Sequence, residues 1–256
     1  MLLTSSPGVT FQVSRDQKGL TWDNYQQGLA TWRRNQDIIS PWLGNDLNQY
    51  PNKKFLGYSG MDLETIEALE KGWRRRDRKE AARWGYAMYV ADNPAIAKYF
   101  ANWIKPAFGG AQATTYVCQI WARDGAIFDR LQKIWVPESE PKTNVSGKPF
   151  DIAWSQEDRD RKVASWGVQK PYILFSRHMN MGAGFPVSGR WNEMVIYGQI
   201  QEALLITVRM ADQHLNADIK AGNHIRYEQM LSAWNITVPT ETWNDFRKHG
   251  ETWIQK

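Results

Sequence analysis

Residues 53–73, KKFLGYSGMDLETIEALEKGW, indicate the fold most clearly, because a strand in this stretch passes directly into a helix. The apolar run FLGY predicts a strand over residues 54–59, and Asp62 is expected to cap the helix that follows. Ser59 and Gly60 lie at the junction, where proteins often hold phosphates or carboxamides. The same two residues also suit a simple turn, so the rest of the sequence has to decide between these interpretations.

The composition is typical of a globular protein that acts away from membranes. The 256 residues are 42% hydrophobic and 23% charged, and no apolar run reaches the roughly 18 residues that cross a bilayer. We therefore expect a soluble protein with no membrane partner. The first 17 residues lack the features of a signal peptide, which fits a protein that works where it is made or a chain without its leader.

Cysteine and histidine usage argues against a disulfide scaffold and against a metal site. The single cysteine, Cys118, excludes an internal disulfide, and its apolar surroundings predict a buried strand residue. The four histidines are scattered without metal-ligand spacing. We therefore expect no metal.

Short strands interspersed with single helices, without a regular βαβ repeat, predict an α+β fold. We treat residues 1–256 as a single domain with three parts. These are a helical N-terminal layer (1–52), a catalytic core (54–210) and a helical C-terminal tail (211–256). Strands are expected at 54–59, 86–91, 114–122, 172–176, 192–198 and 203–210, helices at 62–71 and 93–103, a turn at 124–125, and loops with one short helix at 137–171.

Three separated segments carry residues that could form one site. In GYSG, Gly60 has no side chain, so its backbone could approach a planar amide closely. In GYAMYVADNPAIAKYFA, Tyr89 leaves a strand while Tyr99 and Phe100 lie on the next helix, where two rings could form the walls of a flat slot. In WNEMVIYG, Glu193 opens an apolar strand, where a charge is costly unless it has a task or a partner.

Each segment also has a purely structural interpretation. Ser59 and Gly60 could form a turn, Tyr89 and Phe100 could be core aromatics, and Glu193 could be an exposed carboxylate at the end of a strand. The order and the context of the three segments favour a functional site over these alternatives.

Taken together, the segments resemble the NAD-dependent ADP-ribosyltransferases, and most closely the branch of diphtheria toxin and exotoxin A. In that branch, a strand ending in Tyr-His-Gly precedes a helix like DLETIEALEKG. An aromatic strand and helix like MYVADNPAIAKYFA follow, and then a catalytic Glu on a later strand. The resemblance covers residues 54–210 and is strongest over 55–101. It implies an ADP-ribosyltransferase-like split mixed β core with flanking helices.

The resemblance implies that NAD is the substrate and assigns roles to the first segment. Ser59 stands where the family has the histidine that holds the NAD ribose, and Gly60 would bind the nicotinamide carboxamide through its backbone. Serine is shorter than histidine, so a water or the arginines of residues 74–78 would have to complete this contact. Without such help, the chain would be a non-catalytic relative.

The resemblance also assigns the remaining site residues. Tyr89 and Phe100 would sandwich the nicotinamide, with Tyr99 beside Phe100. Glu193 would accept a hydrogen bond from a ribose hydroxyl and stabilise the oxocarbenium-like charge that develops as nicotinamide departs. Arginine-modifying members carry an acidic or amide residue two positions before this Glu. Here that position is Trp191, so arginine is a disfavoured acceptor.

The resemblance implies a mono-ADP-ribosyltransferase of the toxin or effector type, with a role in virulence. Such a protein would be secreted or injected and would act in the reducing cytosol of a target cell. It would pass ADP-ribose to a protein, a nucleic acid or water, and an inhibitory partner would accompany it. Loops at 137–171 and 179–190 would select the acceptor. The alternative is a catalytically inactive module that binds a protein or nucleic acid through the basic residues 73–79, WRRRDRK, or an α+β domain of unrelated use.

Overall fold

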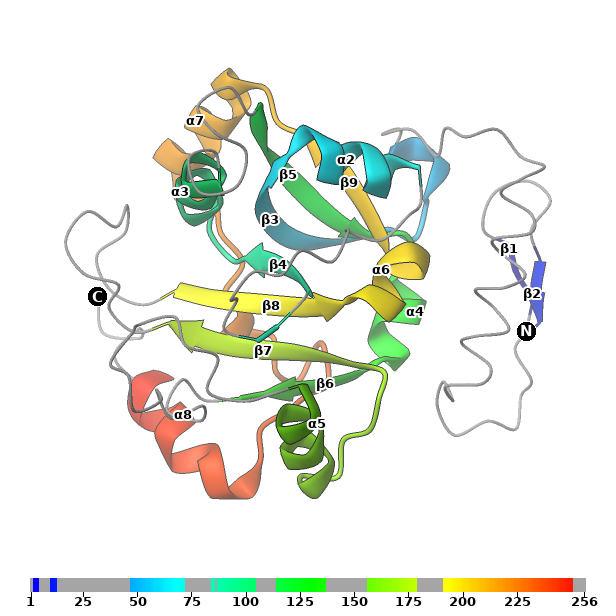
Figure 1. The fold of residues 1–256 in the computed structure, drawn as a ribbon, viewed down its shortest axis with the longest axis vertical. Coiled ribbons are helices and arrows are strands. Elements are labelled where there is room, and N and C mark those ends of the chain that lie inside the picture. The colour runs from blue at the N-terminus through cyan, green and yellow to red at the C-terminus, as the bar shows by residue number, and fades with distance from the viewer. Residues whose placement is uncertain are drawn as a thin grey trace.

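The computed structural model describes residues 2–4, 10–12, 47–71, 84–85, 87–104, 114–136, 156–178 and 191–250. Its centre is one eight-stranded mixed sheet with helices packed around it (Figure 1), which confirms the α+β class. The strands follow one another across the sheet in the order β10 (Ile236–Thr237), β6 (Gln132–Trp135), β7 (Tyr172–His178), β8 (Trp191–Tyr197), β4 (Ala87–Ala91), β3 (Lys54–Asp62), β5 (Thr115–Ala122) and β9 (Leu205–Arg209).

Local side-chain caps fix the starts of the helices next to the site. Asp62 Oδ1 accepts from the Thr65 N–H at 2.7 Å, which confirms the predicted cap of the first helix. The next helix is capped by Asn93, whose Oδ1 accepts from Ala95 N–H at 2.8 Å. The described helices are α2 (Leu63–Glu70), α3 (Pro94–Ile104), α4 (Gly125–Arg130), α5 (Gln156–Ser165), α6 (Gly198–Leu204), α7 (Asp212–Ala221) and α8 (Trp243–Gly250), with short 3-10 turns η1 (Leu47–Gln49), η3 (Tyr227–Gln229) and η4 (Thr240–Thr242).

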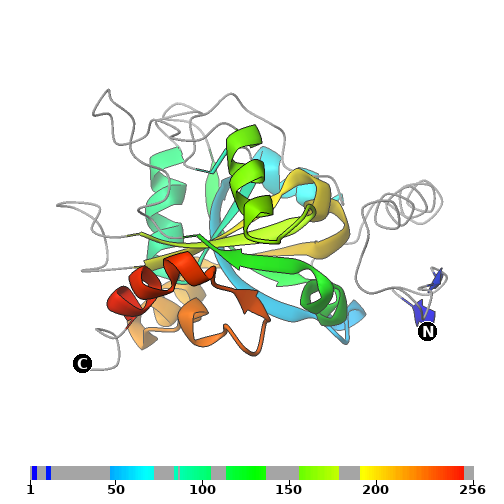
Figure 2. The ribbon, with the colours of Figure 1, turned by 90° about the horizontal axis from the view of Figure 1, so that it is seen from below.

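The sheet narrows where β3 meets β4. Strand β3 pairs with β5 along its whole length, whereas the described part of its pairing with β4 is the single register pair Tyr58↔Ala91. This join separates one half (β3, β5 and β9) from the other (β4, β8, β7, β6 and β10). Viewed from below, the strands fan apart from one another (Figure 2). Ser59 and Gly60 lie on β3 and Tyr89 lies on β4, so these predicted site residues are on the two strands of this join.

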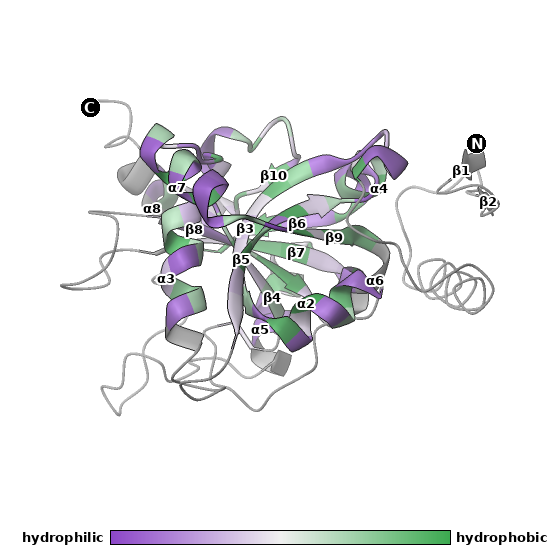
Figure 3. Ribbon diagram, turned by 90° about the horizontal axis from the view of Figure 1, so that it is seen from above, coloured by the Kyte–Doolittle hydropathy of each residue, from purple (hydrophilic) through white to green (hydrophobic). Residues whose placement is uncertain are grey.

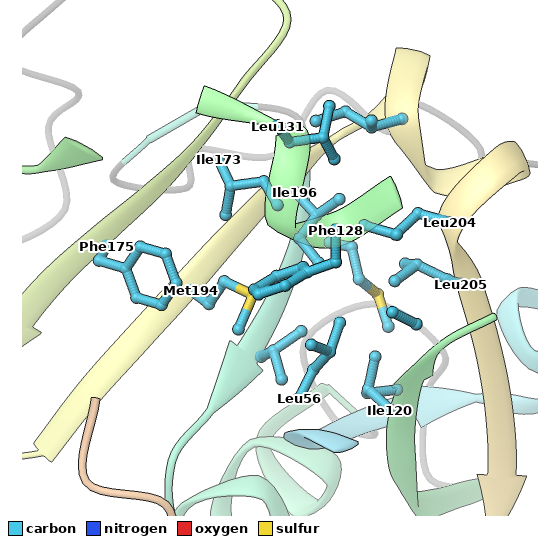
Figure 4. Close-up of a cluster of buried hydrophobic side chains, with 14 of the residues drawn as sticks. Leu56, Ile120, Phe128, Leu131, Ile173, Phe175, Met194, Ile196, Leu204 and Leu205 are labelled. Carbon is cyan, nitrogen blue, oxygen red and sulfur yellow. The ribbon is translucent and has the colours of Figure 1, made fainter. Parts of the chain in front are cut away.

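Both halves of the sheet contribute to one hydrophobic core. Figure 4 shows Leu56 and Ile120 from one half opposite Met194 and Ile196 from the other, with the ring of Phe128 from α4 between them. All five side chains are fully buried. In Figure 3, hydrophobic residues are most evident on strands such as β6 and β7, while α3 and α7 carry hydrophilic as well as hydrophobic residues. The core holds the two halves together where their backbone pairing is sparse.

The burial predicted for Cys118 can be compared directly with the structure. Cys118 is fully buried in β5, and burial raises the pKa of its thiol to about 12, which confirms a buried strand residue. Among the described residues, no helix is long and apolar enough to span a membrane. Within the same residues, no cluster of three histidine, cysteine or acidic side chains could hold a metal.

The structure differs from the predicted elements at four places. The GYSG segment lies inside β3, because the strand continues to Asp62 in register with β5, and so it does not form a turn. The predicted turn after Asp124 is the start of α4. Helix α6 precedes β9 where a single strand over 203–210 was expected. The strands β6 and β10 were not predicted, and β10 adds a strand to the sheet within the tail that was expected to be helical.

Little of the predicted N-terminal layer falls within the described residues. Strands β1 (Leu2–Thr4) and β2 (Thr10–Gln12) pair antiparallel with each other, and η1 leads into β3. The helical pattern expected between residues 22 and 43 lies outside the described residues.

Candidate functional site

The strand order brings the three predicted segments together at the join of the sheet. Ser59 on β3 donates its hydroxyl proton to the backbone carbonyl of Tyr89 on β4, with 2.7 Å between the oxygens. On the other side of β4, Ala91 is in register with Glu193 of β8. Residues that are separated by more than 130 positions in the sequence thus lie on three adjacent strands.

Glu193 is buried, with 4% of its surface exposed. This finding overturns the alternative of an exposed carboxylate at a strand end. Its Oε1 accepts a hydrogen bond of 2.6 Å from the indole Nε1–H of Trp84, which is 1% exposed. Across the β7–β8 pairing it faces Ser176, whose buried hydroxyl has no hydrogen-bond partner among the described residues. A donated hydrogen bond favours the ionised form of a buried carboxylate.

Aromatic residues flank Glu193 on both sides along β8. Because side chains alternate along a strand, Trp191, Glu193 and Val195 point to the same face of the sheet. The Trp191 ring packs against Phe100 of α3, with 5.6 Å between ring centroids. Val195 belongs to a cluster that includes Tyr89. Along β8, Glu193 therefore lies between Trp191, which contacts Phe100, and Val195, whose cluster includes Tyr89.

The predicted ring residues lie in two neighbouring clusters. Tyr89 belongs to the cluster of Trp84 and Val195, and its hydroxyl accepts from Trp84 N–H and donates to the Gly85 carbonyl, both at 2.9 Å. The Tyr99 ring meets Phe100 edge-on at 5.5 Å. The structure places Tyr89 and Phe100 in separate clusters. A slot shared by the two rings therefore stays a prediction.

Gly60 has a structural role that the sequence prediction did not include. A Cβ at this position would lie 2.3 Å from the Ala97 carbonyl oxygen and 2.4 Å from the Ala101 backbone nitrogen. Helix α3 therefore packs its backbone directly against β3. The pair of alanines four residues apart on α3 is the sequence signal that could have predicted this close approach.

Sequence reasoning missed the buried arginine that borders this site. Arg159 of α5 is buried, donates to the Trp84 carbonyl, and lies 4.3 Å above the centre of the Tyr197 ring. Its Nε donates to the Tyr172 hydroxyl at 3.2 Å. In the sequence, Arg159 belongs to the charged run QEDRDRK, which resembles a solvated surface, so no local signal pointed to it.

A second carboxylate lies next to the site, at the end of β4. Asp92 Oδ2 accepts from the backbone N–H of Asn192 at 3.0 Å and from its side-chain amide at 2.8 Å. The same amide donates to Glu228 at 2.7 Å. Burial raises the pKa of Asp92 well above its usual range, although the bonds from Asn192 lower it. Asp92 thus fixes the residue that precedes Glu193.

Several predicted features lie outside the described residues, namely the basic segment 73–79 and the loops at 137–155 and 179–190. No protein-family model matches this chain, and no curated protein sequence matches it. The resemblance to the ADP-ribosyltransferases therefore stays a prediction, which depends on the residues named above.

Proposed function

We propose that this protein is an NAD-dependent mono-ADP-ribosyltransferase, and that water can take the place of the macromolecular acceptor. One observation supports this proposal most strongly. Glu193 is a buried carboxylate of β8, flanked on the same face of that strand by Trp191, whose ring packs against Phe100, and by Val195, whose cluster includes Tyr89. A negative charge beside flat apolar surfaces suits a reaction in which a planar ring leaves and a cation forms.

The reaction would break the bond between ribose C1 and the nicotinamide nitrogen. The bonding electrons leave with the nitrogen, so nicotinamide departs as a neutral ring and positive charge develops on the ribose. Glu193 would accept a hydrogen bond from a ribose hydroxyl and stabilise that charge, which is largest in the transition state. An acceptor nucleophile, or water, then forms the new bond to C1 and loses its proton.

Ser59 and Gly60 would contact NAD in ways that their packing limits. The Ser59 hydroxyl donates to the Tyr89 carbonyl, so toward a ribose hydroxyl it would act as an acceptor. The Cβ side of Gly60 faces α3, so only its backbone N–H and C=O remain for a carboxamide. The proposal therefore assigns most of the catalytic effect to Glu193 and a smaller, positioning contribution to β3.

Release of nicotinamide from NAD tests the proposal, with Glu193→Gln as the decisive variant. Glutamine keeps an oxygen that can accept from the Trp84 indole, so the variant is expected to fold while losing the charge. We expect release to fall by about 10²–10³-fold, the usual effect of removing one group that stabilises transition-state charge. Glu241→Gln is the matched control, because Glu241 also accepts from an indole but lies at the surface. Equal release by wild type and Glu193→Gln would refute the proposal.

The fate of the ADP-ribose separates the transferase from the hydrolase. NAD labelled in its adenylate part is incubated with the protein and with a cell extract that supplies acceptors. Label in protein or nucleic acid indicates transfer, whereas label only in free ADP-ribose indicates hydrolysis. Either result must disappear in Glu193→Gln.

A further inference from the structure

The Glu193 carboxylate is held by a residue that the proposed reaction does not itself require. The Trp84 indole donates to Glu193 Oε1 at 2.6 Å, and both side chains are almost completely buried. An indole N–H can only donate, so it cannot bind the carboxyl group equally well once that group is protonated. The contact therefore holds one carboxylate oxygen in position and favours the ionised form of the group.

Trp84 is in turn held through its backbone from three directions. Its N–H donates to the Tyr89 hydroxyl at 2.9 Å. Its carbonyl accepts from the guanidinium of Arg159 and, at 3.3 Å, from the hydroxyl of Tyr197. These partners come from β4, α5 and β8, so the indole is anchored to the elements that surround Glu193.

The Arg159 guanidinium is fixed by its own set of contacts. It stacks on the Tyr197 ring, donates to the Tyr172 hydroxyl, and lies 3.5 Å from the Asp160 carboxylate. The Tyr172 hydroxyl donates to the same Asp160 at 2.6 Å, and Lys170 completes an ion pair with Asp160. A buried arginine with its donors paired in this way is a rigid support for the groups that it contacts.

From this chain of contacts we infer that Trp84 is the positioning residue for the Glu193 carboxylate, and that Arg159 keeps Trp84 in place. The inference rests on the proposed function, in which Glu193 is the catalytic carboxylate. Helix α5 thereby acts on the site without touching NAD, through Arg159 and then Trp84. The expected consequence is a loss of turnover rather than of NAD binding when the indole N–H is removed.

The molecule contains a matched control for this contact. Trp166 donates its indole N–H to Glu241, so the chain carries the same pair of chemical groups at its surface. There the pKa of Glu241 is lowered by the hydrogen bond from Lys162 and, next, by the bond from Trp166. Trp166 also packs against the cluster of Trp84 and Val195, so Trp166→Phe removes the same kind of bond as Trp84→Phe while keeping an aromatic ring on that cluster.

Kinetics of nicotinamide release test the functional consequence. We expect Trp84→Phe to lower kcat by about 10–100-fold, the usual cost of a misplaced catalytic group, with KM for NAD unchanged. The lost donor should also raise the pKa of Glu193, so the acid limb of the pH profile should move to higher pH. Arg159→Lys should act in the same direction, and Trp166→Phe should match wild type. A Trp84→Phe variant with wild-type kcat and acid limb would overturn the inference, and so would a faster variant.

A spectroscopic measurement tests the contact without relying on activity. In protein labelled with ¹⁵N at the tryptophan indoles, the Trp84 signal is the one that disappears in Trp84→Phe. We expect this signal to shift with pH in wild type and to stop titrating in Glu193→Gln. A Trp84 signal that is unaffected by Glu193→Gln would overturn the inference.

The two measurements separate the failure of the inference from the failure of the proposed function. If wild type releases no nicotinamide while the Trp84 signal still follows Glu193, the positioning contact is supported and the proposed enzymatic function is refuted. If wild type releases nicotinamide while the Trp84 signal ignores Glu193, the function is supported and the inference is overturned.

Discussion

Asp92 and Glu193 are two buried carboxylates on one pair of strands, and they differ in what surrounds them. Glu193 is in register with Ala91, so Asp92, one residue further along the chain, lies beside Asn192. Because side chains alternate, the two carboxylates point to opposite faces of the sheet. Asp92 accepts bonds from the backbone and amide of Asn192, whereas Glu193 accepts a bond from an indole between aromatic clusters.

The different hydrogen-bond partners of the two carboxylates indicate that Asp92 stabilises the fold, whereas Glu193 belongs to the proposed catalytic site. Asp92 bonds the main chain and the side-chain amide of Asn192 on the neighbouring strand, so its contacts hold two segments of the fold together. Glu193 bonds the indole of Trp84, whose backbone N–H and carbonyl are bonded by residues of three elements. Substitutions at the two carboxylates test this division of roles.

The largest expected difference is in catalysis. Asp92→Asn should retain nicotinamide release within a few-fold of wild type, while Glu193→Gln should lose about 10²–10³-fold. Asparagine keeps the acceptor oxygen for Asn192, so the start of β8 should stay in place. Steady-state release of nicotinamide at neutral pH measures both variants. A loss in Asp92→Asn as large as that in Glu193→Gln would mean that the two carboxylates act together in the reaction.

The second largest difference is in stability. Asp92→Ala removes the acceptor of the Asn192 backbone N–H and leaves this buried donor unpaired. We expect Asp92→Ala to be less stable than Asp92→Asn by about 1–3 kcal/mol, the usual cost of one unsatisfied buried polar group. Urea unfolding of both variants gives the comparison, with Glu193→Gln as the variant that should unfold close to wild type. Equal stability of the alanine and asparagine variants would remove the structural role of Asp92.

A third prediction concerns the pH dependence of stability. Because the pKa of Asp92 is higher in the folded protein than in the unfolded chain, the folded state binds this proton more tightly. The resulting stabilisation is fully present below the unfolded pKa and is lost as pH rises through the folded pKa. Asp92→Asn should remove this decrease, so the difference between the two unfolding curves should grow with pH. A constant difference would show that the carboxyl group titrates normally.

The sequence predicted the elements whose signals are local. Strand β4 is predicted by its run of apolar and aromatic residues. Helix α3 is predicted by the pair Asn93-Pro94 at its start, where Asn93 supplies the cap. Strand β6 has four residues and β10 has two, and both pair in parallel with distant segments. Such short, non-local pairings leave no periodic pattern in the sequence.

The site could be predicted only in part for the same physical reason. Glu193 attracted attention because a charge in an apolar strand is costly, and its burial agrees with that argument. Gly60 was assigned to ligand binding or to a turn, and its contact with the α3 backbone was missed because it depends on how a helix packs on a strand. Trp84 and Arg159 are brought together only by folding. Trp84 is one of 14 tryptophans and Arg159 belongs to the charged run QEDRDRK, so nothing in the sequence singles out either residue.

The smallest expected effect concerns a third carboxylate, Glu241, which is exposed and pairs with Lys162 and Trp166. Surface ion pairs contribute little because water and salt screen them. Glu241→Gln should therefore leave nicotinamide release unchanged and should alter urea unfolding so slightly that the difference disappears at high salt. Burial, rather than the presence of an indole donor, is then what distinguishes Glu193 from Glu241. If Glu241→Gln impaired release as Trp84→Phe is expected to, contacts on the outer side of α5 would have to be included in the support of the site.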